Sequence, residues 1–117
     1  DGDYRRCVKS ASDPRVEKML SFIHHNYTAN ISIADIANEI QLGEVQFRKI
    51  FRQEIGMTPA NYLHRQRLLH AIQLLIRSSY DLSEIAARSG FRSSNYFCRS
   101  FRKFYQMTPS EFRHCNH

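Results

Sequence analysis

Cysteine is scarce in this chain, and several signatures of common functional classes are missing. The three cysteines, Cys7, Cys98 and Cys115, are too few and too widely spaced for a disulfide framework, which suits a reducing compartment. No apolar run approaches the length of a membrane span, and no basic segment followed by an apolar one opens the chain. No nucleophile elbow, phosphate loop or catalytic acid pair is present. We therefore predict neither an enzyme nor a membrane protein, and we expect the cytoplasm as its location.

Acidic residues are absent from one long stretch. The whole chain has 17 Lys and Arg against 11 Asp and Glu, which gives a formal net charge of +6. No acid occurs from Ile85 to Ser110, whereas this stretch holds five basic residues: Arg88, Arg92, Arg99, Arg102 and Lys103. Because solvated faces usually mix both signs of charge, the run indicates an anion-binding surface.

The histidines show no metal-binding pattern. His24 and His25 are adjacent, so on a helix their side chains would point to different sides. The tail from His114 to His117 lacks a second, suitably spaced pair of ligands. The sequence therefore predicts no metal site and no cofactor.

Apolar residues recur at helical spacing, and strand-like alternation is lacking. Pro14 suits the first position of a helix, with Ser12 or Asp13 as the N-cap. The apolar residues of this first helix are Val16, Met19, Leu20, Ile23 and Tyr27. A second helix follows the Ser32 cap, with the stripe Ile33, Ile36, Ala37 and Ile40. A third helix ends at Gly56 and points Phe47, Ile50 and Phe51 inward.

A long helix is predicted from Pro59 to about Arg77. Its apolar residues are Leu68, Leu69, Ala71, Ile72, Leu75 and Ile76. A face this broad predicts burial on two sides, as expected of a connector between two subdomains.

The sequence then repeats itself. The phrase GMTPANYL at residues 56–63 returns as QMTPSEFR at residues 106–113. The apolar pattern returns as well: Leu82, Ile85 and Ala86 mirror Ile33, Ile36 and Ala37, and Phe97 and Phe101 mirror Phe47 and Phe51. The offset is 49 residues before the turn and 50 after it, so the second copy has one extra residue near GFRSS. We infer an internal duplication of a helix–turn–helix unit.

Each helix–turn–helix unit holds one helix where it can enter the DNA major groove. With the phenylalanines inward, the outward faces of these two helices are Val45, Arg48, Lys49 and Arg52, and Asn95, Cys98, Arg99 and Arg102. Both faces carry cations and no carboxylate, because Glu44 and Glu54 fall nearer the flank. We assign base readout to Val45, Gln46, Lys49, Ser94, Asn95 and Arg99. We assign phosphate contacts to Arg48, Arg52, Arg102 and Lys103.

Cys98 falls near the DNA in this register and allows two interpretations. A thiol beside Arg99 and Arg102 could have a lowered pKa and act as a redox switch. We favour the simpler alternative, a small neutral contact or filler.

Residues 81–113, DLSEIAARSGFRSSNYFCRSFRKFYQMTPSEFR, resemble the signature segment of the AraC/XylS family of bacterial transcription regulators. The first copy, ISIADIANEIQLGEVQFRKIFRQEIGMTPANYL, is similar to that family's first helix–turn–helix, and the resemblance covers about residues 13–113. It implies an all-α domain of about seven helices, with two homeodomain-like helix–turn–helix subdomains bridged by the long helix. It also implies base-contacting positions at Val45, Gln46, Lys49, Ser94, Asn95, Cys98 and Arg99.

The resemblance also implies an arrangement of domains. Family members typically use such a domain as the C-terminal half of a regulator whose N-terminal half senses a ligand or dimerises. We therefore interpret residues 1–12 as a linker or tail from a missing N-terminal region that would hold the effector site and any dimerisation surface. The expected parts are a first subdomain (13–58), a connecting helix (59–77) and a second subdomain (78–117).

Two positions depart from the family pattern. Gln106 stands where the family often has Gly, so a left-handed helix end there would carry strain. Gly43 stands where a Ser often begins the first reading helix, and it is a weaker cap. Both departures affect the pose of a reading helix rather than the fold.

The expected function is sequence-specific binding of double-stranded DNA that regulates transcription at the nucleoid. Two reading helices would occupy successive major-groove segments of an asymmetric site. One rival is a protein-interaction module whose basic face docks an acidic partner such as an RNA polymerase subunit. Another is a DNA-modifying protein in which this domain positions a catalyst, with Cys7 as the alkyl acceptor, although companion cysteines for a metal-activated thiolate are lacking.

Overall fold

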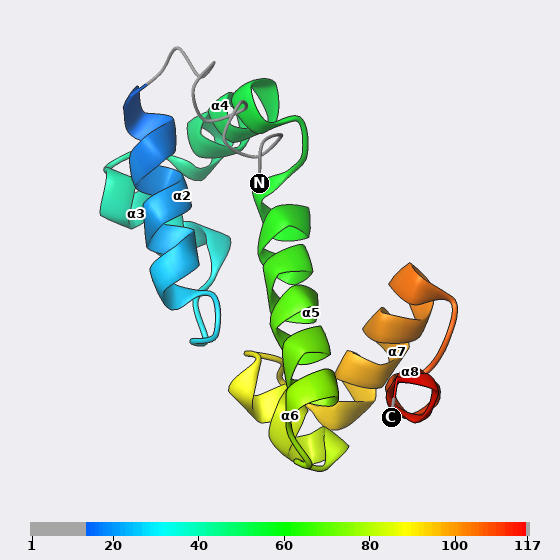
Figure 1. The fold of residues 1–117 in the computed structure, drawn as a ribbon. Coiled ribbons are helices and arrows are strands. Elements are labelled where there is room, and N and C mark those ends of the chain that lie inside the picture. The colour runs from blue at the N-terminus through cyan, green and yellow to red at the C-terminus, as the bar shows by residue number, and fades with distance from the viewer. Residues whose placement is uncertain (1–13, 117) are drawn as a thin grey trace. The chain divides into compact units, whose positions relative to one another are not determined.

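All the regular secondary structure in residues 14–116, the part of the chain that the computed structural model describes, is α-helix. The helices are α2 (Pro14–Asn26), α3 (Ile33–Ile40), α4 (Glu44–Ile55), α5 (Pro59–Arg77), α6 (Leu82–Arg88), α7 (Ser94–Tyr105) and α8 (Pro109–Cys115) (Figure 1). These seven helices confirm the all-α prediction. The expected linker at residues 1–12, the Ser12 or Asp13 cap, Cys7 and His117 lie outside the described residues.

The chain divides into two compact units, and the division falls within α5. Residues 14–26 and 31–64 form the first unit, whereas residues 27–30 and 65–116 form the second. The segment Tyr27–Asn30 therefore belongs with the second unit, although it joins α2 to α3 along the chain.

The first unit packs α2, α3, α4 and the start of α5 around apolar side chains. The apolar residues buried there are Val16, Met19, Leu20, Ile23, Ile36, Ala37, Phe47, Ile50, Phe51, Tyr62 and Leu63. The Phe51 ring lies between two others, 5.8 Å from Phe47 and 5.5 Å from Tyr62 between centroids. These contacts fix the inward side of α4, as the periodicity predicts. Tyr27 is an exception, because it follows the end of α2, is half-buried and belongs to the second unit.

The second unit repeats this plan with α6, α7 and α8 against the rest of α5. Its core comprises Leu68, Ala71, Leu75, Ile85, Ala86, Phe91, Phe97 and Phe101. The expected two-sided burial of α5 is wrong in part, since Leu69 is 43% exposed and Ile76 is 41% exposed. Both residues lie at the edge of the apolar face, beyond the stripe that contacts the core.

The repeated MTP phrase is a helix start in both copies. Thr108 caps α8: its Oγ1 accepts from the Glu111 amide at 3.1 Å, and the Glu111 carboxylate accepts from the Thr108 amide at 2.9 Å. In the first copy, Thr58 Oγ1 accepts from the Asn61 amide at 3.2 Å at the start of α5. Pro59 and Pro109 each open a helix at the position where a missing amide costs nothing.

Left-handed residues also recur at matching positions. Within the described part of the chain, positive φ angles occur at Gln41 (64°), Gly56 (92°), Gly90 (94°) and Gln106 (64°). Gln41 and Gly90 follow α3 and α6, while Gly56 and Gln106 end α4 and α7, so each copy uses one glycine and one glutamine. The left-handed end expected at Gln106 is confirmed.

Substitutions at the matched left-handed positions Gly56 and Gln106 should change the free energy of unfolding in opposite directions. Gln106→Gly should raise the free energy of unfolding by up to about 1 kcal/mol, because glycine adopts the left-handed conformation without strain. Gly56→Ala should lower it by about 1 kcal/mol, since a Cβ at residue 56 would meet no atom within 4 Å and only backbone strain is added. Urea unfolding followed by circular dichroism measures both changes. A destabilised Gln106→Gly variant would contradict this explanation.

Candidate nucleic-acid interface

The outward face of α4 presents the side chains expected there. Val45, Gln46, Arg48, Lys49 and Arg52 are all exposed, and Val45 is 81% exposed. Such an exposed apolar side chain is suited to contact a thymine methyl group. Gly43 precedes the helix without a side-chain cap, as the sequence predicts.

The outward face of α7 is similar, although two of its predicted residues are half-buried. Asn95, Arg99, Arg102 and Lys103 are exposed, and the hydroxyl of Ser93 accepts a capping hydrogen bond from the Tyr96 amide at 3.1 Å. Cys98 is half-buried and packs against the core of the second unit. Ser94, the first residue of the helix, is also half-buried. Cys98 and Ser94 are therefore less accessible than the other residues predicted for this face.

Several cations near these faces are already engaged. Arg48 forms an ion pair with Glu44 at 3.1 Å, so a carboxylate does reach the outward side of α4. Arg88 bonds Glu84 at 2.7 Å and lies 4.3 Å above the Tyr80 ring. In contrast, the remaining outward cations make no ion pair with another residue of the described chain: Lys49, Arg52, Arg99, Arg102 and Lys103.

The unpaired cations occupy matching places in the two copies. Lys49 corresponds to Arg99 and Arg52 to Arg102, at an offset of 50 residues, and all four are exposed. In each helix the first of the pair lies nearer the N-terminus and the second lies one turn of helix later. Each copy thus offers a helix face able to bind a polyanion.

Comparison with known proteins identifies the family. A family model described as a helix-turn-helix domain matches residues 36–114, more than half of the chain. The HTH-type transcriptional activator RhaR of Yersinia pseudotuberculosis is 37% identical over 99 residues, which cover 85% of this chain and 34% of that protein. A transcriptional regulator of Chromobacterium violaceum with an AraC-type DNA-binding domain has a TM-score of 0.79 at 29% identity, covering 88% of this chain and 92% of that one. The chain belongs to the AraC/XylS family.

A DNA-bound structure is also among the structural neighbours. The DNA-binding domain of AdpA, solved in complex with a target DNA, has a TM-score of 0.81 at 28% identity, covering 89% of this chain and 93% of that one. This chain is accordingly an AraC/XylS DNA-binding domain, and the family consists of transcription regulators rather than enzymes. It spans about a third of the length of the curated relatives it matches.

The thiol of Cys98 lacks the electrostatics of a redox switch in this AraC/XylS domain. Burial raises the pKa of the Cys98 thiol, because a thiolate would lose hydration there. A redox-sensing cysteine needs the opposite shift. The structure therefore favours the interpretation of Cys98 as a small, neutral filler.

The two histidines expected to point apart do so, and His24 lies against the buried Tyr62 of the first unit. His24 Nε2 lies 2.7 Å from the Tyr62 hydroxyl, whereas His25 Nδ1 lies 2.8 Å from the Ser21 carbonyl on an exposed surface. Within residues 14–116, no three His, Cys, Asp or Glu side chains gather as metal ligands would. No helix in the same range is long and apolar enough to cross a membrane.

Two half-buried histidines, His24 and His70, give the AraC/XylS domain a pH-dependent stability. Burial lowers the pKa of His24 and of His70 below 6.5, and the charge of His25 lowers that of His24 further. The unfolded chain therefore binds protons first, so this contribution is complete above pH 6.5 and is lost as the pH falls towards the folded-state pKa values. The melting temperature should therefore be lower at pH 5 than at pH 7.5. The double variant His24→Gln/His70→Gln should flatten this profile, while His114→Gln, at an exposed position, should not.

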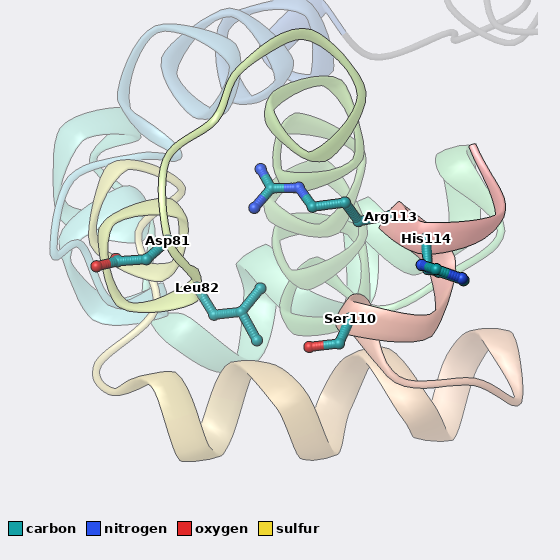
Figure 2. A pocket seen from close by; sticks show the side chains of 5 residues that line it. All are labelled: Asp81, Leu82, Ser110, Arg113 and His114. Atoms are coloured by element: carbon teal, nitrogen blue, oxygen red, sulfur yellow. The ribbon is translucent and has the colours of Figure 1, made fainter. Parts of the chain in front are cut away.

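A shallow hollow lies beside α8 in the second unit (Figure 2). Its lining residues are Asp81, Leu82, Ser110, Arg113 and His114. Arg113 reaches from α8 towards the segment that enters α6, and its guanidinium donates to the carbonyls of Tyr80 at 2.6 Å, Ser78 at 3.1 Å and Leu75 at 3.2 Å. Because its donors already have these acceptors, Arg113 stabilises the α5–α6 connection and is not a free anion site.

Proposed function

We propose that this domain binds double-stranded DNA sequence-specifically and regulates transcription, with α4 and α7 as its two recognition helices. The observation that carries the proposal is the pair of matched, exposed basic faces, with Lys49 and Arg52 on α4 and Arg99 and Arg102 on α7. Chance exposure on one amphipathic helix would be unremarkable, but the duplicated placement supports a shared role. The DNA complex of the AdpA domain supports the same proposal.

Each of the two helices would contact both bases and phosphates, with different side chains. Base-edge contacts come from the first turns and the middle of each helix, where Lys or Arg suits guanine, Asn suits adenine and Val suits a thymine methyl. The proposed base-contacting residues are Val45, Gln46, Lys49, Ser94, Asn95, Cys98 and Arg99, with Cys98 as a small neutral contact. The proposed phosphate-contacting residues are Arg48, Arg52, Arg102 and Lys103. Arg48 would exchange its partner Glu44 for a phosphate.

The proposed DNA site is asymmetric and bipartite. Val45 and Lys49 on α4 correspond to Asn95 and Arg99 on α7, so the two faces differ chemically. A single chain would place the helices in successive major-groove segments, about 34 Å apart along the duplex, with residues 59–77 as the connecting helix between subdomains 13–58 and 78–117. Effector sensing and dimerisation we assign to a further region of the protein, and its place of action to the cytoplasmic nucleoid.

Binding to a fluorescent random-sequence duplex tests this proposal against protein docking. Four phosphate contacts predict that affinity falls about 100-fold between 50 and 200 mM salt. Unlabelled duplex should compete fully, whereas an acidic RNA polymerase subunit should not displace the DNA at equal concentration. Absence of DNA binding at 50 mM salt, with retention on the acidic subunit, would replace the proposal with the docking module.

A further inference from the structure

Arg67 is a cation of the second unit that is turned to the protein backbone rather than to solvent. It lies in α5 and is half-buried. Its Nε donates to the Tyr27 carbonyl at 2.6 Å, and its Nη2 donates to the Ala29 carbonyl at 2.9 Å. The planar fork of a guanidinium can bond both carbonyls at once, and a lysine ammonium cannot reproduce that geometry. Arg67 thus ties the segment Tyr27–Asn30 to α5.

The tied segment touches the turn that leads into α7. A Cβ atom on Gly90 would lie only 2.7 Å from the Tyr27 carbonyl oxygen, 2.9 Å from Arg67 Nε and 3.0 Å from the Thr28 Cα. Backbone therefore meets backbone at this point, and the left-handed Gly90 is the residue that permits it. Only three residues separate Gly90 from the start of α7 at Ser94.

A second contact supports the same turn. His70, also in α5, places its Nδ1 3.1 Å from the hydroxyl of Ser89, which is fully buried. The Tyr27 ring packs edge-on against His70, with 5.7 Å between centroids. The α6–α7 turn is thus held from α5 and from residues 27–30, and Arg67 joins these two supports.

We infer that Arg67 is a positioning residue for recognition helix α7, acting through the segment 27–30 and Gly90 rather than by touching DNA. The inference rests on the proposed function, because it assigns α7 one block of the DNA site. Base discrimination needs a side chain held to within a fraction of an ångström, which depends on a rigid support behind it. When the two hydrogen bonds of the Arg67 guanidinium are lost, segment 27–30 becomes more mobile. Gly90 then loses the fixed backbone against which it packs. The pose of α7 then becomes less defined, while α4 keeps its own support in the first unit.

Arg67→Lys tests the inference because it keeps the charge and removes the fork. The probe is the duplex that the wild-type chain selects from a random pool, together with single base-pair substitutions in each block. We expect Arg67→Lys to lose about fivefold or more of its discrimination in the α7 block, with the α4 block changed less than about twofold. The slope of log affinity against log salt should stay as in the wild type, because no phosphate contact is lost. Arg65→Lys, an exposed position on the same helix, is the matched control and should change neither block.

Each outcome has a defined meaning. Retained discrimination in the α7 block of a folded Arg67→Lys chain would overturn the inference and leave the proposed function intact. A salt slope reduced by about one contact in Arg67→Met would assign Arg67 to a phosphate instead. If the wild-type chain selects no second block, the proposed function fails, and the inference fails with it. Thr28→Gly, at an exposed position, loosens the same segment without removing Arg67; it should weaken the α7 block in the same direction and serves if Arg67→Lys does not fold.

Discussion

Phe97→Ala is expected to lower the free energy of unfolding by about 3–5 kcal/mol. The Phe97 side chain is fully buried, and its ring lies 5.0 Å from Phe91 and 5.9 Å from Phe101 between centroids. Truncation removes this burial and leaves a cavity in the core of the second unit that the packed rings cannot fill. Since a small domain has only about 5–15 kcal/mol of stability, much of the margin of the second unit would be lost. Urea unfolding followed by circular dichroism measures the effect, because the chain contains no tryptophan for fluorescence.

Phe104→Ala is the matched control for this prediction. Phe104 lies on the same helix but is 50% exposed. Its truncation should cost about 1 kcal/mol or less. Equal losses from the two variants would contradict the placement of Phe97 in the core of the second unit.

Arg99→Ala is expected to remove about 1–3 kcal/mol of base discrimination at one or two positions of a selected duplex. Arg99 is exposed, makes no ion pair within the described chain, and occupies the place that Lys49 holds on α4. A guanidinium there can donate two hydrogen bonds to one guanine, which alanine cannot replace. Fluorescence anisotropy against the selected duplex and its single base-pair variants measures the change.

Arg102→Ala is the comparison that distinguishes loss of base recognition from loss of a phosphate contact. Arg102 is one turn further along α7, and as a phosphate contact it should weaken all sequences alike and reduce the salt slope by about one contact. Base preference should survive in this variant. If Arg99→Ala also keeps its base preference and only changes the salt slope, α7 binds the phosphate backbone and does not read sequence.

Much of the fold was predictable because the sequence repeats. Two copies of one apolar pattern identify the inward residues twice over, so Phe47 and Phe51 could be checked against Phe97 and Phe101. The helix starts were equally readable, since Thr and Pro in each MTP phrase satisfy or remove the first free amides. The exposed cations on α4 and α7 followed directly from these inward positions.

Other features depended on contacts that no local pattern reveals. Arg67 resembles any exposed helix cation in the sequence, because its partners are main-chain carbonyls 38 and 40 residues away. Arg113 likewise donates to carbonyls 33 to 39 residues away. The half-burial of Cys98 was missed because an angular count ignores how far neighbouring side chains extend.

The ion pair between Glu44 and Arg48 was also readable from the sequence. Glu44 and Arg48 are four residues apart on a helix, which is the spacing at which such pairs form. The offset of 49 residues also matched Gln41 to Gly90 and so indicated a second left-handed end, which the structure shows at Gln41.

Selection from a random pool of duplex DNA with the purified chain tests the central claim most directly. If α4 and α7 both read sequence, the selected DNA should contain two short enriched sequence blocks. The blocks should be centred about one helical turn apart and differ in sequence. Sequencing of the bound fraction after several rounds would show both blocks on the same molecules. Enrichment of a single block, or salt-sensitive binding without any enrichment, would contradict two-headed recognition by α4 and α7.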